Sequence, residues 1–457
     1  MRIVVVGNGM AAVRLVEGLV GHHHDITVVS AEPVAPYNRI LLSAVLEGSH
    51  REAAITLRPP RWYADHGVDL ILGRRVTDID RPCREAVLAD DSRIGYDALV
   101  LATGSLPSLP PIRGLVGPDG RMNQKVHAFR SLADCHGLQQ AVTVAHSAVV
   151  VGGGLLGLQV ARALSVRGLN VEIVEGGEHL LQRQVDQGAA AVLQRSLDKL
   201  GTTTYAGAFA VGMTDKGLRL DNGYLLDTDM VVLTAGSRPN VRLARRAGLV
   251  LGNGVVVDDE LRTSDRAIHA IGDCAEHAGR TTGFVPPAWA QASVLARILN
   301  GEQARYHGHR AVARLRATDL DVAVLGDPEH TAGEIVQVSN PITGTHKKLV
   351  VADGVVVAAT LVGDLSRIGL ITQAFDKRTV LGDGEPGALL LADKPATPIE
   401  LGDDAEVCAC AGVSAGRIRA CSSVDQVCET TRATTGCGGC RPMVEQLLHA
   451  NLVKGSA

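Results

Sequence analysis

The sequence predicts an α/β protein with two Rossmann-like domains, a small α+β domain and a short cysteine-rich module. A strand-like apolar run, a glycine-rich turn, a helical pattern and a second apolar run follow one another near the N-terminus, and the same order returns about 145 residues later. After about residue 300 the pattern changes to alternating, strand-like segments, and paired cysteines lie near the end of the chain.

Composition supports a globular protein of several domains and excludes some partners. The 457 residues are 46% hydrophobic and 21% charged, with a net charge of −4 and no basic tract, so we expect no nucleic-acid partner. No apolar run reaches the roughly 18 residues that a membrane helix needs. A strand directly after Met1 leaves no room for a signal peptide. We therefore expect a cytoplasmic protein without membrane contact, whose nine cysteines are free thiols or metal ligands.

The first glycine-rich turn has the pattern of a dinucleotide-binding fingerprint. It follows a predicted strand at residues 3–6, opens a predicted helix at 10–19, and reads Gly7, Asn8, Gly9, Met10, Ala11, Ala12. Gly7 permits the tight turn, Gly9 lets the backbone approach a pyrophosphate, and Ala12 keeps the helix close to the sheet. Glu32, after the strand at 26–29, is the acid available for an adenosine ribose, and a solvated loop glutamate is the alternative.

Two later segments favour a flavin at this first site. Ala102, Thr103 and Gly104 end a predicted strand at 98–101, where a small residue and a turn fit beneath a flavin nucleotide. Gly272 and Asp273 follow a strand at 267–270, which places a carboxylate within reach of ribityl hydroxyls. A Gly–Asp pair alone is more typical of a turn, but the three segments together predict an FAD domain.

The second glycine-rich turn is a complete fingerprint. It lies between a predicted strand at 148–151 and a predicted helix at 155–167, and reads Gly152, Gly153, Gly154, Leu155, Leu156, Gly157. Glu175 closes the next strand, at 171–174, where a carboxylate binds the ribose diol and repels a 2′-phosphate, so NADH is preferred to NADPH. Gly236, in the segment 234–240, mirrors the turn at Gly104.

These signals predict an NAD domain inserted in the FAD domain, because flavin signals flank the second fingerprint. The predicted ranges are 1–115 for the first part of the FAD domain, 116–244 for the NAD(H)-binding domain, 245–304 for the second FAD part, 305–395 for a small α+β interface domain, and 405–457 for the cysteine module. The α+β range contains a hairpin signal at 352–354.

The cysteine module carries two doublets, Cys408 with Cys410 and Cys437 with Cys440. Four thiolates in this arrangement hold either a 2Fe–2S cluster or zinc, and buried thiols without a ligand are the structural alternative. A flavin in the same chain favours iron–sulfur, since a cluster accepts single electrons from a two-electron carrier. Cys421 and Cys428, between the doublets, are interpreted as core or helix-face residues.

Residues 36–43, 180–186, 270–277 and 285–291 resemble the pyridine-nucleotide flavoprotein reductases. Within that group the chain is most similar to the assimilatory NADH–nitrite reductase large subunit and to the electron-transfer subunit of assimilatory nitrate reductases. Residues 434–448 resemble the 2Fe–2S domain of bacterioferritin-associated ferredoxins.

The resemblance implies roles for particular residues. Gly7, Gly9, Ala12, Arg39, Thr103, Gly104 and Asp273 would serve FAD, with Trp289 and Gln291 near the isoalloxazine. Met10, Ala11, Glu32, Ser43, Val76, Ala102 and Gly272 complete the predicted flavin-binding set. Gln159 stands where relatives often have Glu beside the nicotinamide, which puts the affinity there in doubt. Residues 38–47 hold no cysteine, unlike disulfide-reducing relatives, and hydride transfer needs stacked rings rather than an acid or base, so no catalytic side chain is predicted.

The expected function is electron transfer from NADH through FAD and a 2Fe–2S cluster to a partner reductase. The resemblance points to the molybdenum-containing catalytic subunit of assimilatory nitrate reductase, because no sirohaem domain follows the module and the acceptor is expected on another polypeptide. A reductase for a separate sirohaem nitrite reductase, an oxygenase or a ferredoxin is the enzymatic alternative. A redox-sensing binding module is the non-enzymatic one. Homo- and hetero-oligomers both remain open.

Overall fold

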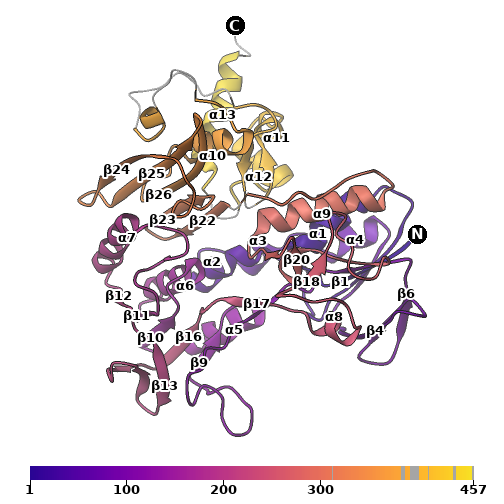
Figure 1. The fold of residues 1–457 in the computed structure, drawn as a ribbon, viewed down its shortest axis with the longest axis horizontal. Helices are drawn as coiled ribbons and strands as arrows, with labels where there is room; N and C mark the ends of the chain where they lie inside the picture. The colour runs from indigo at the N-terminus through magenta and orange to yellow at the C-terminus, as the bar shows by residue number, and fades with distance from the viewer. Residues whose placement is uncertain (311, 382–385, 392–400, 410, 436–438, 455–457) are drawn as a thin grey trace. The chain divides into compact units, whose positions relative to one another are not determined.

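The structure is a computed structural model that describes residues 1–310, 312–381, 386–391, 401–409, 411–435 and 439–454 (Figure 1). The chain divides into two compact units. The first consists of Met1–Arg39, Ile55–Ser108 and Ser237–Ala311, and the second of Ile40–Ala54, Leu109–Gly236 and Val312–Ala457. The domain ranges predicted from sequence remain a prediction.

The first unit is built on a five-stranded parallel sheet. In sheet order its strands are β19 (Ile268–Ala270), β7 (Ala98–Leu101), β1 (Arg2–Val6), β2 (Asp25–Val29) and β3 (Val68–Ile71). Their Val, Ile and Leu residues suit strands that are buried on both faces. Helix α1 (Met10–Leu19) joins β1 to β2 and lies beside α9 (Val285–Leu299), so the predicted strand–turn–helix–strand unit is confirmed (Figure 1).

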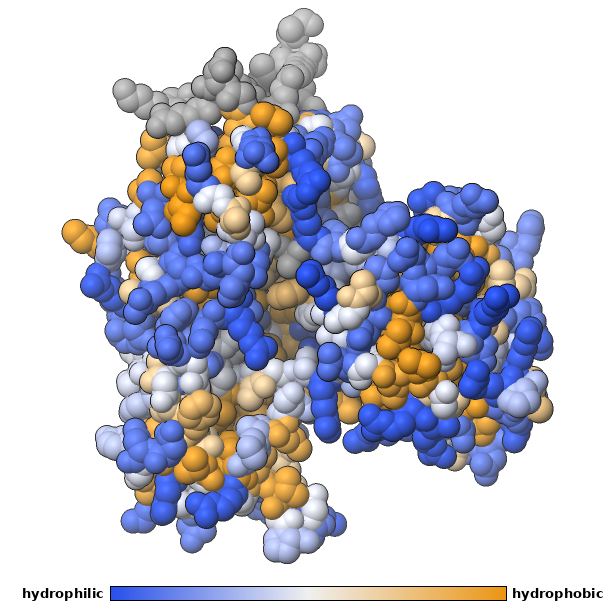
Figure 2. Space-filling model, in the orientation of Figure 1, coloured by the Kyte–Doolittle hydropathy of each residue, from blue (hydrophilic) through white to orange (hydrophobic). Residues whose placement is uncertain are grey.

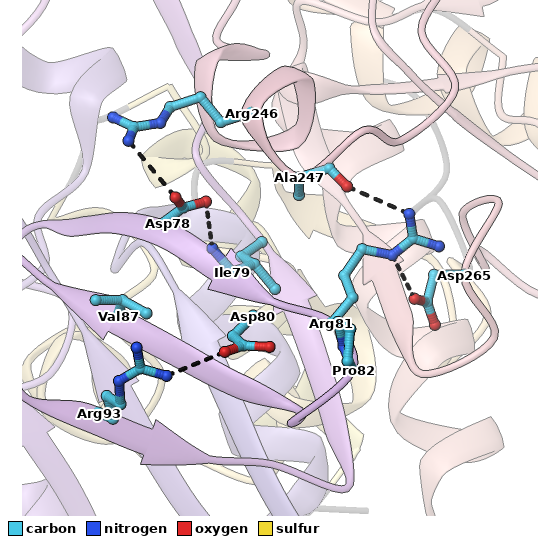
Figure 3. Close-up of a pocket in the computed structure, with 10 residues that line it drawn as sticks. All are labelled: Asp78, Ile79, Asp80, Arg81, Pro82, Val87, Arg93, Arg246, Ala247 and Asp265. Atoms are coloured by element: carbon cyan, nitrogen blue, oxygen red, sulfur yellow. Dashed lines mark hydrogen bonds and ion pairs between the residues drawn. The ribbon is translucent and has the colours of Figure 1, made fainter.

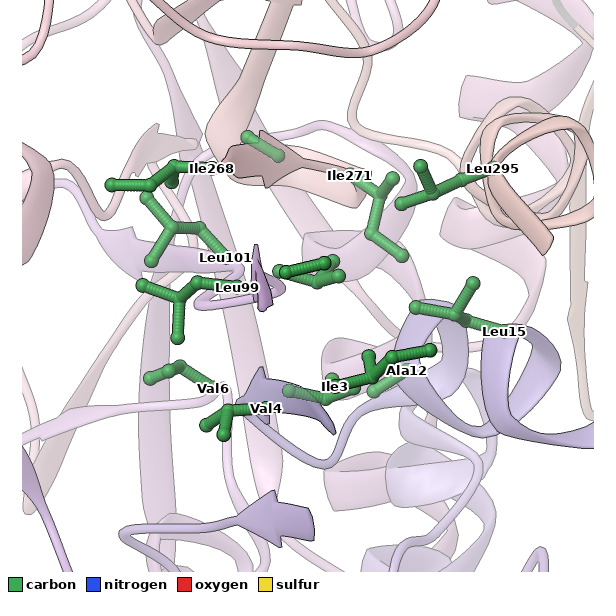
Figure 4. Packing of buried hydrophobic residues seen from close by; sticks show 14 of the residues in the cluster. Ile3, Val4, Val6, Ala12, Leu15, Leu99, Leu101, Ile268, Ile271 and Leu295 are labelled. Carbon is green, nitrogen blue, oxygen red and sulfur yellow. The ribbon is translucent and has the colours of Figure 1, made fainter. Parts of the chain in front are cut away.

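Packing between the sheet and these helices makes the core of the first unit. Ile3 and Val4 of β1, Leu99 of β7, Leu15 of α1 and Leu295 of α9 are at most 1% exposed and lie in one cluster (Figure 4). Burying each such side chain contributes about 1.5–3 kcal/mol. This core holds the turn after β1 in place.

Smaller sheets and short helices complete the first unit. They are β4 (Val76–Asp80) with β5 (Glu85–Leu88) and β6 (Arg93–Gly95), β18 (Val255–Val257) with β20 (Ala275–His277) and β21 (Arg280–Thr281), β8 (Ser105–Pro107) with β17 (Ser237–Pro239), and helices α4 (Pro60–Asp65) and α8 (Arg242–Arg246). The pair β8–β17 brings together segments on either side of the second fingerprint.

The second unit repeats the parallel design. Its sheet order is β12 (Thr203–Ala206), β11 (Asn170–Glu175), β10 (Ser147–Val151), β16 (Met230–Leu233) and β9 (Val126–Ala128), with β13 (Ala210–Thr214), β14 (Gly217–Leu220) and β15 (Leu225–Asp227) as an antiparallel addition. The helices of this part are α2 (Leu42–Glu47), α5 (Leu132–Val142), α6 (Leu155–Val166) and α7 (Gln187–Lys199). The second predicted Rossmann-like fold is therefore confirmed.

An antiparallel sheet follows in the second unit, as the α+β prediction required. Its order is β22 (Val312–Ala317), β23 (Leu320–Leu325), β26 (Val355–Val362), β25 (Thr345–Ala352) and β24 (Glu334–Asn340), and α10 (Ile368–Lys377) packs on β26 (Figure 1). The predicted hairpin at 352–354 joins β25 to β26 with Asp353 at φ 50°.

The cysteine module is a small α-helical bundle with one short hairpin. It contains β27 (Glu406–Cys408), β28 (Val413–Ser414), α11 (Ala415–Arg419), α12 (Val424–Thr431) and α13 (Arg441–Lys454). Cys408, Val413, Ile418, Val427 and Val444 share its core.

Hydrophilic residues cover much of the face shown in Figure 2, and hydrophobic residues gather there in separate patches. Exposed large apolar side chains include Ile335 and Val338 on β24. In the part of the chain that the structure describes, no helix combines the length and apolar character needed to cross a bilayer.

Candidate functional site

Helix α1 begins without a capping side chain. Its N-cap is Gly9, and no described side chain accepts a hydrogen bond from the first turn. A Cβ placed on Gly9 would meet nothing within 4 Å. The first N–H groups of the helix therefore face open space, which is the arrangement that binds a pyrophosphate.

Gly7 makes the tight turn before this helix. Its φ is +109°, and a Cβ there would lie under 3.0 Å from the backbone oxygen of Ala102. The N–H of Ala102 donates to the Val6 oxygen at 2.9 Å. The structure thus brings Gly7 and Ala102, two of the predicted flavin-binding residues, together at the carboxyl ends of β1 and β7.

Asn8, between the two glycines, supplies a donor that the sequence analysis missed. Its Oδ1 accepts a hydrogen bond from the Tyr63 hydroxyl at 3.0 Å, and burial raises the pKa of Tyr63, which keeps that donor protonated. Its Nδ2 is buried without a hydrogen-bond partner among the described residues. A buried amide without a partner costs about 1–3 kcal/mol, so a bound dinucleotide that accepts from it fits the site.

Glu32 and Arg39 form one charged cluster with Tyr37. The Tyr37 hydroxyl donates to Glu32 Oε2 at 2.7 Å, and Arg39 pairs with Glu32 and lies over the Tyr37 ring at 4.9 Å. Burial lowers the pKa of Arg39, but Tyr37, Glu32 and Asp273 outweigh burial and the net pKa is raised. Glu32 is therefore no isolated loop carboxylate. The side chain can hold a ribose while it fixes Arg39.

Asp273 is held at the end of β19, in a 3₁₀ turn Gly272–Cys274. The Ser105 hydroxyl donates to Asp273 Oδ2 at 2.9 Å. The N–H of Gly272 donates to Oε1 of Gln291 at 2.7 Å, and Gln291 is 1% exposed. Ser105 had no signal of its own in the sequence, because its role depends on a contact with a residue far along the chain.

Helix α9 is also fastened to the start of α1. Trp289 Nε1 donates to the backbone oxygen of Met10 at 3.2 Å. A Cβ on Gly272 would lie 3.2 Å from the Cβ of Ala11. The structure thus gathers five of the predicted flavin-binding residues around one helix end: Met10, Ala11, Gly272, Trp289 and Gln291.

The remaining predicted flavin-binding residues lie on other elements and have other contacts. Thr103 Oγ1 donates to the Asn240 oxygen at 2.8 Å, and Gly104 turns the chain with φ +67°. Ala12 is fully buried, and Val76 is 8% exposed in the same core. Ser43 lies on α2, buried, in the second unit.

The second fingerprint repeats these features in the second unit. Helix α6 begins at Gly154 without a capping side chain, and a Cβ there would meet nothing within 4 Å. A Cβ on Gly152 (φ +115°) would lie under 3.0 Å from the Thr234 oxygen, and one on Gly157 would lie closer still to the Gly152 oxygen. In contrast, side chains of Ser131 and Asp186 cap α5 and α7. Helices α9 and α10 also begin without a capping side chain, so the glycine turn that precedes α1 and α6, rather than the missing cap alone, distinguishes the two fingerprint helices.

Glu175, at the end of β11, binds the backbone of the glycine-rich turn through its carboxylate. Its two carboxylate oxygens accept from the N–H of Gly153 at 2.6 Å and of Gly177 at 2.7 Å. Each oxygen keeps another lone pair for a ribose hydroxyl. Leu155, Leu156 and Gln159 lie partly exposed in the first turns of α6, and Gly236 turns the chain with φ +92°.

Two of the four predicted cluster ligands lie within the described residues. Cys408 ends β27 and Cys440 precedes α13, and their thiols are 3% and 8% exposed. A hydrogen bond with Cys440, together with burial, raises the pKa of Cys408. Two buried thiols in contact suit a shared metal centre, where a positive metal offsets the cost of ionising them. Cys410 and Cys437 lie outside the described residues.

One open pocket of about 840 Å³ lies elsewhere in the first unit, beside β4–β6 and α8 (Figure 3). Its charged side chains pair with one another: Arg246 with Asp78 at 3.5 Å, Arg93 with Asp80 at 3.0 Å, and Arg81 with Asp265 at 2.7 Å. None of the predicted site residues lines it.

Comparison with known proteins identifies the families to which the two parts of the chain are similar. Residues 1–293 match the family model described as pyridine nucleotide-disulphide oxidoreductase, and residues 406–450 match the BFD-like 2Fe-2S binding domain. The chain is 34% identical to nitrite reductase (NAD(P)H) of Bacillus subtilis (strain 168), over 99% of this chain and 58% of that protein. It is 31% identical to the assimilatory nitrate reductase electron transfer subunit of the same organism, over 98% of this chain and 59% of that protein.

A solved structure has the same fold. The structure described as the covalent putidaredoxin reductase-putidaredoxin complex is similar with a TM-score of 0.76 and 27% identity, over 85% of this chain and 95% of that chain. The chain spans less than two thirds of the length of the two Bacillus subtilis relatives. It belongs to the pyridine nucleotide-disulphide oxidoreductase family, carries a BFD-like 2Fe–2S domain, and has FAD, NAD(P)H and a 2Fe–2S cluster as its cofactors.

Proposed function

We propose that this protein takes electrons from NADH and delivers them, through FAD and a 2Fe–2S cluster, to a partner reductase. The observation that carries the proposal is the pair of glycine turns that open α1 and α6, each before an uncapped helix start, in one chain that also buries two thiols in contact. When bound, FAD accepts two electrons from a nicotinamide and releases them singly to an iron–sulfur cluster.

The chain's own residues position these groups. Gly7, Gly9 and the Asn8 amide would hold the FAD pyrophosphate, Glu32 and Arg39 its adenosine end, and Asp273 its ribityl chain. Gly152, Gly154 and Gly157 would hold the nicotinamide dinucleotide, with Gln159 at its reactive end. Cys408, Cys410, Cys437 and Cys440 would bind the cluster. The further proposed contacts are those of Met10, Ala11, Ala12, Ser43, Val76, Ala102, Thr103, Gly104, Leu155, Leu156, Gly236, Gly272, Trp289 and Gln291.

Glu175 supports NADH as the preferred donor. Its carboxylate is fixed by two backbone N–H groups, so it cannot turn away from a 2′-phosphate. Two glycines follow it, and a carboxylate without an adjacent Arg repels that phosphate.

We propose the molybdenum-containing catalytic subunit of assimilatory nitrate reductase as the acceptor. The support is the similarity along nearly the whole chain to a protein named as the electron transfer subunit of that enzyme. NADH as donor and the free thiols among the described cysteines favour the cytoplasm as its place of action.

The acceptor is tested by reconstitution. The purified protein is mixed with the catalytic subunit, NADH and nitrate under anaerobic conditions, and nitrite is measured. We expect nitrite formation with the wild type and its loss with Cys440→Ser, which keeps the flavin site. No nitrite from a wild-type protein whose cluster NADH has reduced would contradict the nitrate assignment. In that case the reconstitution is repeated with a sirohaem nitrite reductase in place of the catalytic subunit, to test the alternative acceptor.

A further inference from the structure

Cys428 and Thr434 have no part in the proposed chain of carriers, yet they lie beside a proposed cluster ligand. Cys428 is on α12, half-buried, and its Sγ lies 2.8 Å from the Thr434 hydroxyl. Thr434 in turn donates its backbone N–H to Cys440 Sγ at 3.2 Å. One hydrogen-bonded path therefore runs from a helix, through one threonine, to a ligand thiol.

The backbone at Thr434 needs this support. Helix α12 ends at Arg432 with φ +64°, and Thr434 follows with φ +69°, so two residues with side chains occupy the left-handed region within one turn. A β-branched residue rarely adopts that conformation unless its surroundings hold it there. The bond to Cys428 restrains Thr434 at its side chain, and the preceding residue, Ala433, is fully buried.

The same turn carries other bonds that fix its geometry. The Thr431 hydroxyl accepts from the N–H of Ala433 at 3.2 Å, and the Thr435 hydroxyl donates to the Arg432 oxygen at 2.8 Å. These bonds stabilise the turn, and the bond between Cys428 and Thr434 completes the set that directs the Thr434 N–H toward Cys440 Sγ. A preset donor of this kind is what tunes a metal–thiolate centre.

We propose that Cys428 and Thr434 are positioning residues that raise the reduction potential of the cluster, by holding the Thr434 N–H toward Cys440 Sγ. The inference rests on the proposed role of Cys440 as a ligand. Reduction adds negative charge to the cluster, and an N–H donor to a ligand sulfur stabilises that charge. Removing the bond between Cys428 and Thr434 frees the turn and weakens this donor, so the reduced form becomes less favourable.

The experiment measures the midpoint potential of the cluster in the full-length holoprotein by an EPR-monitored redox titration. Cys428→Ala and Thr434→Val remove the side-chain bond from either end, and valine keeps the shape of threonine. We expect both to lower the ratio of reduced to oxidised cluster about tenfold at a given potential, a shift of about 59 mV for one electron. Cys428→Ser and Thr434→Ser keep a hydrogen bond and should stay near the wild-type potential.

Cys421 offers the matched control. Its Sγ also contacts a threonine hydroxyl, that of Thr430 at 3.4 Å, and its other bond is to the Arg417 oxygen. Cys421→Ala should therefore leave the potential unchanged.

Equal potentials in the Ala, Val and Ser variants would overturn the inference, as would an equal shift in Cys421→Ala. Loss of the cluster from both Cys428→Ala and Thr434→Val would also overturn it, because the bond would then retain the cluster rather than tune it. A wild-type protein without any iron–sulfur signal would instead refute the proposed function.

Discussion

Because Gly157 has no side chain, helix α6 can lie close to the glycine-rich turn that precedes it. A Cβ on Gly157 would press on the Gly152 oxygen, in the glycine-rich turn, and would lie 2.8 Å from Oγ1 of Thr234, whose hydroxyl donates to that same oxygen. We predict that Gly157→Ala displaces α6 from this turn and slows the bleaching of the flavin by NADH about 100-fold. Stopped-flow absorbance measures the rate.

Gly137 provides the control for this change. It lies in α5, where a Cβ would meet nothing within 4 Å, so Gly137→Ala should keep the bleaching rate and stabilise the protein by about 1 kcal/mol. A wild-type rate in Gly157→Ala would show that the turn tolerates the extra carbon.

Buried His269 on β19 is expected to make the stability of the protein depend on pH. Burial, and then the charge of Arg262, lower its pKa to about 4, and the side chain is 4% exposed. A histidine in the unfolded chain has a pKa of about 6.5. As the pH falls below that value, the unfolded chain binds a proton that the folded protein does not yet bind. The free energy of unfolding therefore decreases as the pH falls below about 6.5. We predict a loss of about 2 kcal/mol from this group between pH 7.5 and pH 5.

Urea unfolding at the two pH values tests this. His269→Gln should reduce the pH dependence, whereas His23→Gln, at an exposed position, should not. An unchanged pH dependence in His269→Gln would assign the acid sensitivity to other groups.

Helix α7 depends on Asp186 for both its start and its attachment to β25. Asp186 accepts from the Ala189 N–H at 2.8 Å and pairs with buried Lys348 at 3.1 Å. The proximity of His346, whose Nε2 lies 3.6 Å away, and then these bonds lower the pKa of Asp186. Its contribution is therefore complete above the unfolded pKa of about 3.9 and is lost as the pH falls below it.

We predict that Asp186→Ala destabilises the protein by about 3 kcal/mol at pH 7, because it removes a cap and leaves Lys348 with Glu329 as its remaining acidic partner. Ser131→Ala removes only the cap of α5 and should cost about 1 kcal/mol. Equal losses from the two substitutions, measured by urea unfolding, would mean that the pair with Lys348 contributes nothing.

The elements were predictable where the signal is local. Strand β7 and helix α1 begin and end at the predicted residues, because apolar periodicity and glycine turns act within a few residues of the chain. The sequence could not predict that α2 packs against α5 and α6, because such contacts join segments far apart in the sequence. The same limit hid the partners of the site residues: Tyr63 for Asn8, Ser105 for Asp273 and Cys428 for Thr434.

Across the described residues, two glycine fingerprints that each open a helix and a buried thiol pair occur on one chain, and this combination supports the proposed role in electron transfer. Each fingerprint alone accounts only for nucleotide binding. Delivery of single electrons, which a nicotinamide cannot supply directly, would need the cluster that Cys408 and Cys440 are proposed to hold.

An anaerobic titration with NADH, followed by visible absorbance and EPR on the same sample, tests this central claim most directly. The account predicts that the flavin absorbance bleaches and that the EPR signal of a reduced 2Fe–2S cluster rises with it. A flavin that bleaches in a protein containing stoichiometric zinc and no EPR signal would contradict the account.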